Sequence, residues 1–284
     1  MIPPFRIDVP DPAIETAVIV EVPHAGIHVD AASLAHMIAP ARAIGRDADL
    51  FVDLLFEGAA QSGASVLAAN ISRYVVDLNR GPLEYDGLSV DRGGPQNLPR
   101  GLIWRIGTEG DPILAKRLTQ AELDRRLDYL YRPYHAALSE LIDQKRRKFG
   151  AAIVLCAHSM PSQGRRGHVD VGVGRADVVP GTRGRTSAAA PVIDAVDEVA
   201  QSLDFSVKHD DPYKGGFSTG HYGRPKEGVH AIQIELARRL YMDEDALHTV
   251  APGFERTKAL CQALVARLGQ VNLEKLSNPL LSES

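Results

Sequence analysis

Residues 152–160 read A-I-V-L-C-A-H-S-M, a short apolar run that ends in polar residues. Its length and its lack of polar and apolar alternation predict a strand that is buried on both faces, as in a sheet covered by helices. Other apolar runs rich in β-branched residues predict strands in the same way. These runs are Ala17–Val22, Ser65–Ala68, Tyr74–Leu78, Val169–Val173 and Ala231–Leu236.

Helical patterns lie between these runs. They cover Asp47–Gln61, about Pro112–Lys148 with a kink or break at Pro133, Ala188–Leu203 and Asp245–Leu268. Strands that alternate with helices predict an α/β fold of three layers (αβα), in which helices cover both faces of a central, mostly parallel sheet. We expect one domain over residues 1–271 and a polar tail over residues 272–284.

Composition indicates a small ligand. The formal net charge is −4 and the pI is about 6.2, so no overall basic field favours nucleic acid or anionic membrane as a partner. Residues 1–20 lack a signal-peptide pattern, and no apolar run approaches the roughly 20 residues of a membrane span. Cys156 and Cys261 are too few for a disulfide framework. We expect a cytoplasmic monomer or small homo-oligomer.

Two histidines follow predicted strands. His24 ends the segment I-V-E-V-P-H, and His158 occupies the same place after the apolar run at 152–157. Ligands of parallel sheets collect at the carboxyl ends of the strands, and neutral imidazoles are good zinc ligands there. A single histidine could simply cap a turn, but two in equivalent positions favour a metal site.

A catalytic zinc site usually has three protein ligands and an open position for water. The segment R-D-A-D at 46–49 opens the predicted helix after His24 and offers two carboxylates. Either could instead cap that helix, which explains one aspartate more easily than both. We predict Asp49 as the third ligand and keep Asp47 as the alternative.

Glu235 ends the predicted strand at 231–236, where an unpaired carboxylate is costly unless it is functional. A glutamate beside a metal-activated water is the general base that hydrolysis requires. Arg238 and Arg239 follow closely, so a structural ion pair with Glu235 is the competing interpretation. Arg238 is also a candidate for binding substrate.

The segment N-I-S-R-Y-V-V-D-L-N-R at 70–80 supplies further candidates. Arg73 and Arg80 offer planar forks suited to carboxylates, which favours an acidic substrate, and Asn70 is a third candidate. Arg73 could also stabilise the oxyanion of the reaction. Alternatively, Asp77 holds Arg73 in a purely structural role.

The segment 210–224, D-D-P-Y-K-G-G-F-S-T-G-H-Y-G-R, lies just before the Glu235 strand. Its glycines could be ordinary turn residues. The density of polar donors nevertheless predicts an active-site loop, with substrate contacts from Lys214, Thr219, His221 and Arg224.

Several ordered motifs resemble those of the N-formylglutamate amidohydrolase (N-formylglutamate deformylase) family, from about residue 15 to residue 245. They are V-P-H-A-G, D-A-D-L-F-V-D, N-I-S-R-Y-V-V-D-L-N-R, A-H-S-M-P-S, D-P-Y-K-G-G and I-Q-I-E-L-A-R-R-L-Y-M-D. The resemblance implies a mixed sheet flanked by helices, similar to zinc carboxypeptidases and aspartoacylase-like enzymes. It also implies metal-dependent hydrolysis of N-formyl-L-glutamate to formate and L-glutamate, the last step of one route of histidine degradation.

The resemblance places His24, an aspartate of D-A-D and His158 at a divalent metal, with zinc expected, and Glu235 as the base. It differs from carboxypeptidases at Ile27, where their second ligand would be glutamate. Two alternatives remain open. One is another acyl-amino-acid hydrolase or carboxypeptidase-like enzyme on the same scaffold. The other is a non-catalytic protein that binds acidic metabolites.

Overall fold

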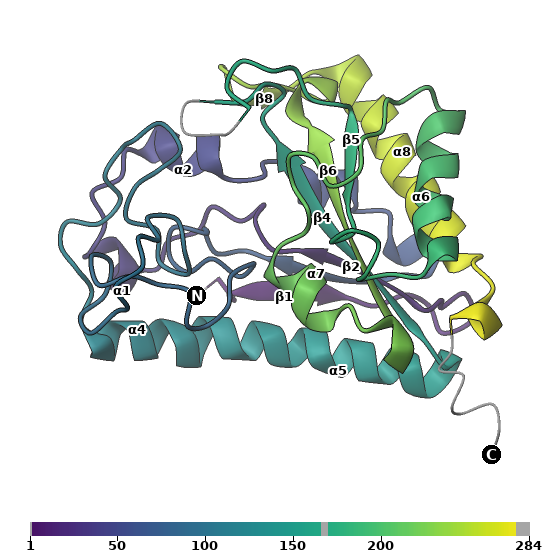
Figure 1. The fold of residues 1–284 in the computed structure, drawn as a ribbon, viewed down its shortest axis with the longest axis horizontal. Coiled ribbons are helices and arrows are strands. Elements are labelled where there is room, and N and C mark those ends of the chain that lie inside the picture. Colours follow the sequence, from purple (N-terminus) through teal and green to yellow (C-terminus); the bar gives the residue numbers. More distant parts are fainter. Residues whose placement is uncertain (1, 166–169, 277–284) are drawn as a thin grey trace.

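The computed structural model describes residues 2–165 and 170–276 and contains a six-stranded mixed sheet (Figure 1). The strand order is β1-β3-β2-β4-β6-β5, in which β3, β2, β4 and β6 are parallel and the edge strands β1 and β5 are antiparallel. The strands of this sheet are β1 (Phe5–Asp8), β2 (Val18–Val22), β3 (Ser65–Ala69), β4 (Ala152–Met160), β5 (Val178–Gly181) and β6 (Val229–Ala237). A small hairpin pairs β7 (Met242–Asp243) with β8 (His248–Thr249).

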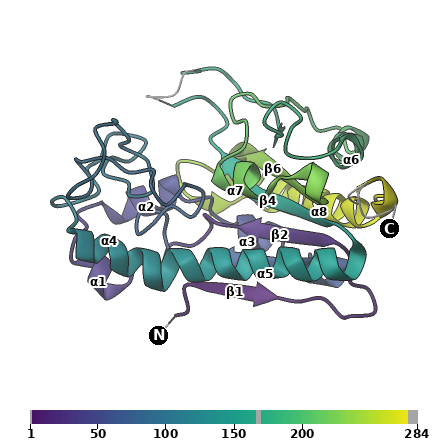
Figure 2. The same ribbon diagram turned by 60° about the horizontal axis from the view of Figure 1, so that its bottom comes forward.

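Helices cover both faces of the sheet (Figures 1 and 2). The α-helices are α1 (Ala31–Leu34), α2 (Ala41–Asp47), α3 (Val52–Leu55), α4 (Gln120–Arg126), α5 (Arg132–Phe149), α6 (Ala190–Ser202), α7 (Phe217–Tyr222) and α8 (Ala251–Gly269). A π-helical turn, η2 (Leu127–Tyr131), joins α4 to α5. Short 3-10 turns are η1 (Ala60–Ser62), η3 (Pro225–Glu227), η4 (Arg238–Leu240) and η5 (Leu273–Lys275).

Successive residues of each central strand enter different cores, because side chains alternate between the two faces of a strand. Val154 and Cys156 of β4 pack toward α4 and α5, whereas Ile153 and Leu155 pack toward α3, α6 and α8. The central strands are buried along their whole length. These two apolar layers confirm the predicted three-layer α/β fold.

Two predicted strands are absent from the sheet. Residues 74–78 form a buried turn, in which apolar side chains fill a core without pairing in a ladder. Of the run Val169–Val173, Val169 lies outside the described residues, and residues 170–173 form a turn with isolated bridges. Composition alone does not distinguish a buried turn from a buried strand.

The two antiparallel edge strands were not predicted. The strand β1 alternates weakly and is only half-buried. The strand β5 contains Pro180, whose missing N–H is tolerated at the edge of a sheet but lowers the strand signal.

Helix boundaries also differ from the prediction. The helix expected at Asp47–Gln61 is replaced by α2, which ends at Asp47, and α3; between them Ala48 is extended and Phe51 is left-handed. The helix expected from Pro112 begins instead at Gln120, capped by the side chain of Thr119. The predicted break near Pro133 is the π-helical turn η2, directly before α5.

The expected polar tail at 272–284 begins with residues that pack on the protein. Leu276 is buried in the core, and its carbonyl oxygen lies 3.0 Å from Nε2 of His230. Residues 277–284 lie outside the described part of the chain. Within residues 2–165 and 170–276, no helix combines the length and apolar character needed to cross a membrane.

Candidate active site

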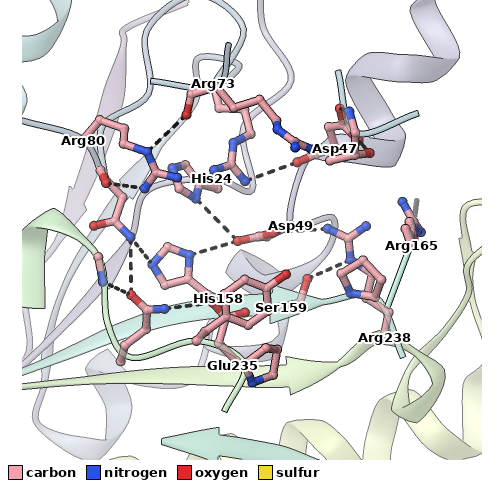
Figure 3. A pocket seen from close by; sticks show the side chains of 18 of the residues that line it. His24, Asp47, Asp49, Arg73, Arg80, His158, Ser159, Arg165, Glu235 and Arg238 are labelled. Atoms are coloured by element: carbon pink, nitrogen blue, oxygen red, sulfur yellow. Dashed lines mark hydrogen bonds and ion pairs between the residues drawn. The ribbon is translucent and has the colours of Figure 1, made fainter. Parts of the chain in front are cut away.

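A cavity of about 360 Å³ lies at the carboxyl ends of the central strands (Figure 3). Its volume is within the range of pockets that hold small ligands. His24 follows β2, His158 lies in β4, Glu235 lies in β6, and Asp49 lies between α2 and α3; all four line the cavity. They meet because β2, β4 and β6 are parallel neighbours whose carboxyl ends share one edge.

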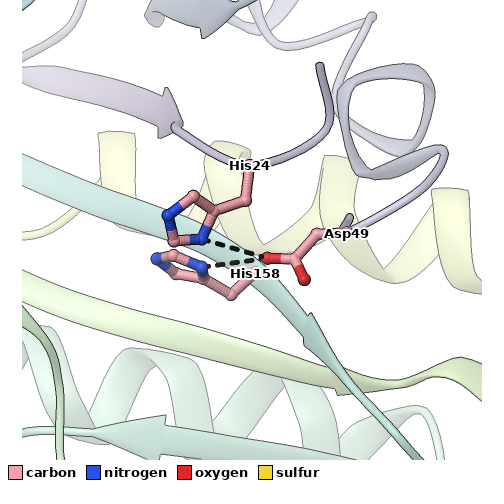
Figure 4. A group of neighbouring side chains, drawn as sticks. All are labelled: His24, Asp49 and His158. Carbon is pink, nitrogen blue, oxygen red and sulfur yellow. Dashed lines mark hydrogen bonds and ion pairs between the residues drawn. The ribbon is translucent and has the colours of Figure 1, made fainter. Parts of the chain in front are cut away.

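His24, Asp49 and His158 form a compact group (Figure 4). Asp49 Oδ2 lies 3.6 Å from His24 Nδ1 and 3.0 Å from His158 Nδ1. One potential ligand atom from each residue lies within 4.8 Å of the others, and all three residues are buried. Two imidazoles and one carboxylate are a donor set that zinc and similar divalent metals accept, with a position left for water.

The carboxylate of Asp77 orients the ring of His24. Its Oδ1 atom lies 2.7 Å from His24 Nε2, which places the ring proton on Nε2 and a lone pair on Nδ1. His24 Nδ1 is buried and has no hydrogen-bond partner among the described residues. A buried lone pair that faces the Asp49 carboxylate is unfavourable unless a cation lies between them. The orphaned atom and the donor set therefore fit a metal ion.

Arg238 holds Asp49 from the other side. Its Nη2 donates to Asp49 Oδ1 at 3.2 Å. Its other hydrogen bonds go to Ala48 O, Arg46 O and Ser159 Oγ. These bonds engage most of the guanidinium donors, so Arg238 positions Asp49 and has little capacity left for the substrate contact that the sequence predicted.

The charge of Asp49 is maintained by its neighbours. Burial would raise its pKa, but the hydrogen bond from His158 and the charge interaction with the two neighbouring imidazoles hold the pKa well below its usual value. Burial also opposes protonation of His158, whereas the bond to Asp49 raises the pKa of that imidazole. The carboxylate is therefore ionised at neutral pH, as a metal ligand must be.

Asp47, the alternative ligand, faces away from the histidines. Its carboxylate accepts from Tyr74 Oη at 2.5 Å and from the backbone N–H of Thr108 at 2.9 Å, and the Thr108 hydroxyl also donates to it. These bonds tie the end of α2 to the loop at 107–108. The geometry therefore separates the two aspartates and groups Asp49 with the histidines.

Glu235 stands beside His158 because the two residues pair across β4 and β6. Its side chain is buried, and this burial raises its pKa. The ion pair considered for Glu235 does not occur among the described residues, since Arg238 pairs with Asp49 and Arg239 with Asp177. Gln233 Nε2 donates to Glu235 Oε1 at 2.8 Å and orients the carboxylate in the cavity.

Arg73 lines the cavity but is bound to the protein. Its Nη2 and Nε lie 2.8 and 3.3 Å from Asp77 Oδ2, so the predicted Asp77 contact is present. Its guanidinium lies 4.5 Å from the ring centroid of Trp104, whose Nε1 donates to the same carboxylate. Asp77 thus joins Arg73 to the ring of His24. The N–H groups of Arg73 that remain can still face a ligand.

The other predicted residues divide between the cavity and the surface. Arg80 and Lys214 line the cavity. Asn70 does not, because its side chain donates to Pro3 O and lies in a separate depression. Its position at the end of β3, on the far side of β2 from the cavity strands, explains this error.

Three predicted loop contacts also lie away from the cavity. Thr219 and His221 belong to α7, and Arg224 lies just after that helix. Thr219 is fully buried against Gly215. His221 stacks on Phe217, with ring centroids 4.7 Å apart. Arg224 is exposed and pairs with Glu227.

Two polar residues that contact His158 or Glu235 were not predicted from the sequence. Asn79 Nδ2 lies 3.2 Å from His158 Nε2, and Gln233 Oε1 accepts from the backbone N–H of Gly216 at 2.8 Å. Gln233 could have been found, because it precedes Glu235 by two residues and so shares its strand face. The loop residues Arg100 and Trp104 also line the cavity and carry no comparable periodic signal.

The fold and the polar cavity at the strand ends define an α/β enzyme, and the comparisons with known proteins give its class as an amidohydrolase. The chain belongs to the N-formylglutamate amidohydrolase family, whose model matches residues 16–242.

Two curated relatives support this assignment. N-formylglutamate deformylase of Pseudomonas putida is 31% identical over 258 residues, which are 87% of this chain and 92% of that protein. The enzyme of the same name from Pseudomonas aeruginosa is 33% identical over 261 residues, with 88% and 91% covered.

Solved structures agree. The crystal structure of N-formylglutamate amidohydrolase from Ralstonia eutropha JMP134 is 31% identical, with a TM-score of 0.86 over 95% of this chain and 98% of that chain. A gene product of Agrobacterium tumefaciens, Atu2144, is 18% identical with a TM-score of 0.62 over 95% and 94%, and so shares the fold.

Proposed function

We propose that this protein hydrolyses N-formyl-L-glutamate to formate and L-glutamate, as the last step of one route of histidine degradation. The observation that carries the proposal is the buried group of His24, Asp49 and His158 beside Glu235, in a chain of this family. The small volume of the cavity and its arginine lining suit a small acidic substrate.

The three clustered residues would hold a divalent metal, with zinc the expected ion. Bound there, zinc would polarise the formyl carbonyl and lower the pKa of water. Glu235 accepts a proton from the attacking water and passes it to the leaving amine, a role that suits a carboxylate with a raised pKa. Arg73 offers N–H groups to the oxyanion that develops on the formyl oxygen.

The domain organisation and the location of the protein belong to the same proposal. Residues 1–271 act as a single catalytic unit, which the match to the family model over residues 16–242 supports. The cytoplasm is the proposed location, and the two buried free thiols, Cys156 and Cys261, are compatible with a reducing compartment.

The test is formate release from N-formyl-L-glutamate by purified protein, with and without a chelator, followed by addition of single metals. We expect the chelator to abolish release and zinc to restore it. Activity that survives complete removal of metal would contradict the metal-dependent proposal. A panel of larger acyl-glutamates and of peptides then tests the rival substrates.

Glu235→Gln should lower kcat about 10³-fold while the protein retains its metal, because the amide keeps the shape but cannot accept the proton. Glu21→Gln is the matched control. Glu21 is also a fully buried glutamate, but it accepts hydrogen bonds from Ser218 and Tyr134 and does not line the cavity. Full turnover by Glu235→Gln would remove Glu235 from the mechanism.

A further inference from the structure

The strand β1 lies at an open edge of the sheet. It pairs with β3 on its inner side, and no other element of the described chain pairs with its outer side (Figure 2). The edge of a sheet exposes N–H and C=O groups that can pair with another extended chain, so proteins usually cover or interrupt such edges. The outer side of β1 is therefore a candidate surface for binding a second chain.

The backbone groups on this outer side belong to Phe5, Ile7 and Val9. Asn70 N donates to Pro4 O at 2.8 Å, so the backbone of Pro4 faces β3. Backbone groups of an antiparallel strand point alternately to its two sides, which turns those of Phe5 and Ile7 away from β3. Val9 continues the alternation, and its N–H and C=O have no hydrogen-bond partner among the described residues. Three alternate residues thus offer their backbone groups to a partner.

The side chains along this edge are unusually apolar for a surface in contact with water. Ile7 is 42% exposed and Val9 is 69% exposed, and both follow the alternation of Phe5, which packs against α5. Ile2 and Ile14, before and after the strand, are exposed as well. A chain that pairs with β1 would remove some of this apolar surface from water.

The charges on the other face of β1 fit a second copy of the same strand. A symmetric antiparallel pair sets outward residues opposite outward residues, so its two-fold axis passes through Arg6, Ile7 or Asp8. An axis through Arg6 sets two arginines opposite each other, and an axis through Asp8 sets two aspartates opposite each other. An axis through Ile7 instead sets Arg6 of each copy opposite Asp8 of the other, where side chains lie closest. The charge pattern favours this one register.

Both charges are available for this contact. Arg6 Nη2 lies 3.4 Å from Asp53 Oδ2, and Arg6 Nε lies 3.5 Å from Asp8 Oδ2. Both ion pairs are long and partly solvated, and such pairs contribute little to stability. Asp8 forms no other ion pair within the part of the chain that the structure describes.

We propose that the outer edge of β1 binds a second copy of this chain, in an antiparallel pairing centred on Ile7. Backbone hydrogen bonds then join Ile7 to Ile7 and Phe5 to Val9 across the axis, and the two sheets become one. The prolines at positions 3, 4 and 10 lack N–H donors and limit the pairing to residues 5–9. No residue of β1 lines the catalytic cavity, so each copy keeps a complete site.

Sedimentation equilibrium of the full chain over a range of concentrations tests the proposal. We expect wild-type protein to reach the mass of two chains. Arg6→Asp and Asp8→Arg each set like charges opposite each other, so each should raise the dissociation constant of the dimer at least about tenfold. An equimolar mixture of the two variants restores opposite charges and should dimerise like wild type. Arg185→Asp is the matched control, because this exposed arginine follows β5 at the opposite edge of the sheet.

Hydrogen exchange locates the interface without any substitution. The amides of Phe5, Ile7 and Val9 should exchange more slowly as the dimer forms. Asp8→Arg keeps the contact between Arg6 and Asp53, so it tests the register even when Arg6→Asp does not fold. Wild-type protein with the mass of one chain at every concentration overturns the proposal. A dimer that neither charge reversal weakens, or in which these amides still exchange rapidly, also overturns it.

Discussion

The two sides of the cavity use their polar groups differently. On the inner side, defined by His24, Asp49, Asp77, His158 and Arg238, nearly every donor already has an acceptor within the protein. On the other side, Arg80 and Arg100 line the cavity and keep guanidinium donors that have no acceptor among the described residues. The inner side therefore satisfies most of its polar groups within the protein and leaves His24 Nδ1 without a partner among the described residues, whereas Arg80 and Arg100 still have donors to offer.

The largest effect should come from breaking the inner side at Arg238. Arg238→Leu leaves Asp49 buried beside two histidines without its cation, so the metal-free protein should lose about 3 kcal/mol of unfolding free energy. Urea unfolding of the metal-free protein measures this loss. The neighbour Arg239→Leu is the control, because its pair with Asp177 is largely exposed and should contribute less than about 1 kcal/mol. Equal losses of unfolding free energy in the two variants would show that the buried Arg238–Asp49 pair contributes no more to stability than the Arg239–Asp177 pair.

A smaller effect should follow from changing Asp77. Asp77→Asn keeps the shape but weakens the hold on His24 Nε2, so metal affinity should fall about 30-fold. Competition with a chromophoric chelator measures this affinity directly, without reference to turnover. Asp47→Asn is the control, since that carboxylate is buried nearby but binds Tyr74 and Thr108 instead of a histidine. A comparable loss of affinity in Asp47→Asn would return Asp47 to the ligand set.

The smallest effect should appear at Arg80, which lines the cavity. Tyr131→Phe removes the hydroxyl that donates to the Arg80 carbonyl, and KM for N-formylglutamate should rise about fivefold with little change in kcat, which corresponds to roughly 1 kcal/mol. Steady-state kinetics separates the two constants. Tyr129→Phe alters an exposed tyrosine on the same π-helical turn and should change neither. A fall in kcat without a change in KM would show that Tyr131 does not act through substrate binding at Arg80.

The sequence predicted the buried core of the fold because parallel strands carry a strong local signal. The runs at 17–22, 65–68, 152–157 and 231–236 became β2, β3, β4 and β6 with boundaries shifted by a few residues. The edge strands β1 and β5 were missed because half-exposed residues and Pro180 weaken that signal. The buried turn at 74–78 was mistaken for a strand, since burial makes both equally apolar.

The residues of the candidate site also fall into those whose position the sequence predicted and those that it placed wrongly. His24, His158 and Glu235 follow or end buried apolar runs, so their positions on the strand-end edge could be predicted. Asn70, Thr219, His221 and Arg224 were wrongly expected in the cavity, because a loop sequence does not specify the direction of its side chains. Arg100 reaches the cavity from the end of a long loop, and no local pattern indicates it.

The sequence by itself determined the order of the four central strands and the types of residue available for chemistry, because periodicity and composition act over neighbouring residues. Only the tertiary structure decided that Asp49 joins the histidines while Asp47 binds Tyr74 and Thr108. It also decided that Arg238 holds the carboxylate of Asp49, while Arg80 bonds to main-chain carbonyls and pairs with no carboxylate among the described residues. Those choices depend on hydrogen bonds between segments far apart in the chain. Such bonds are fixed by how buried groups find partners in three dimensions.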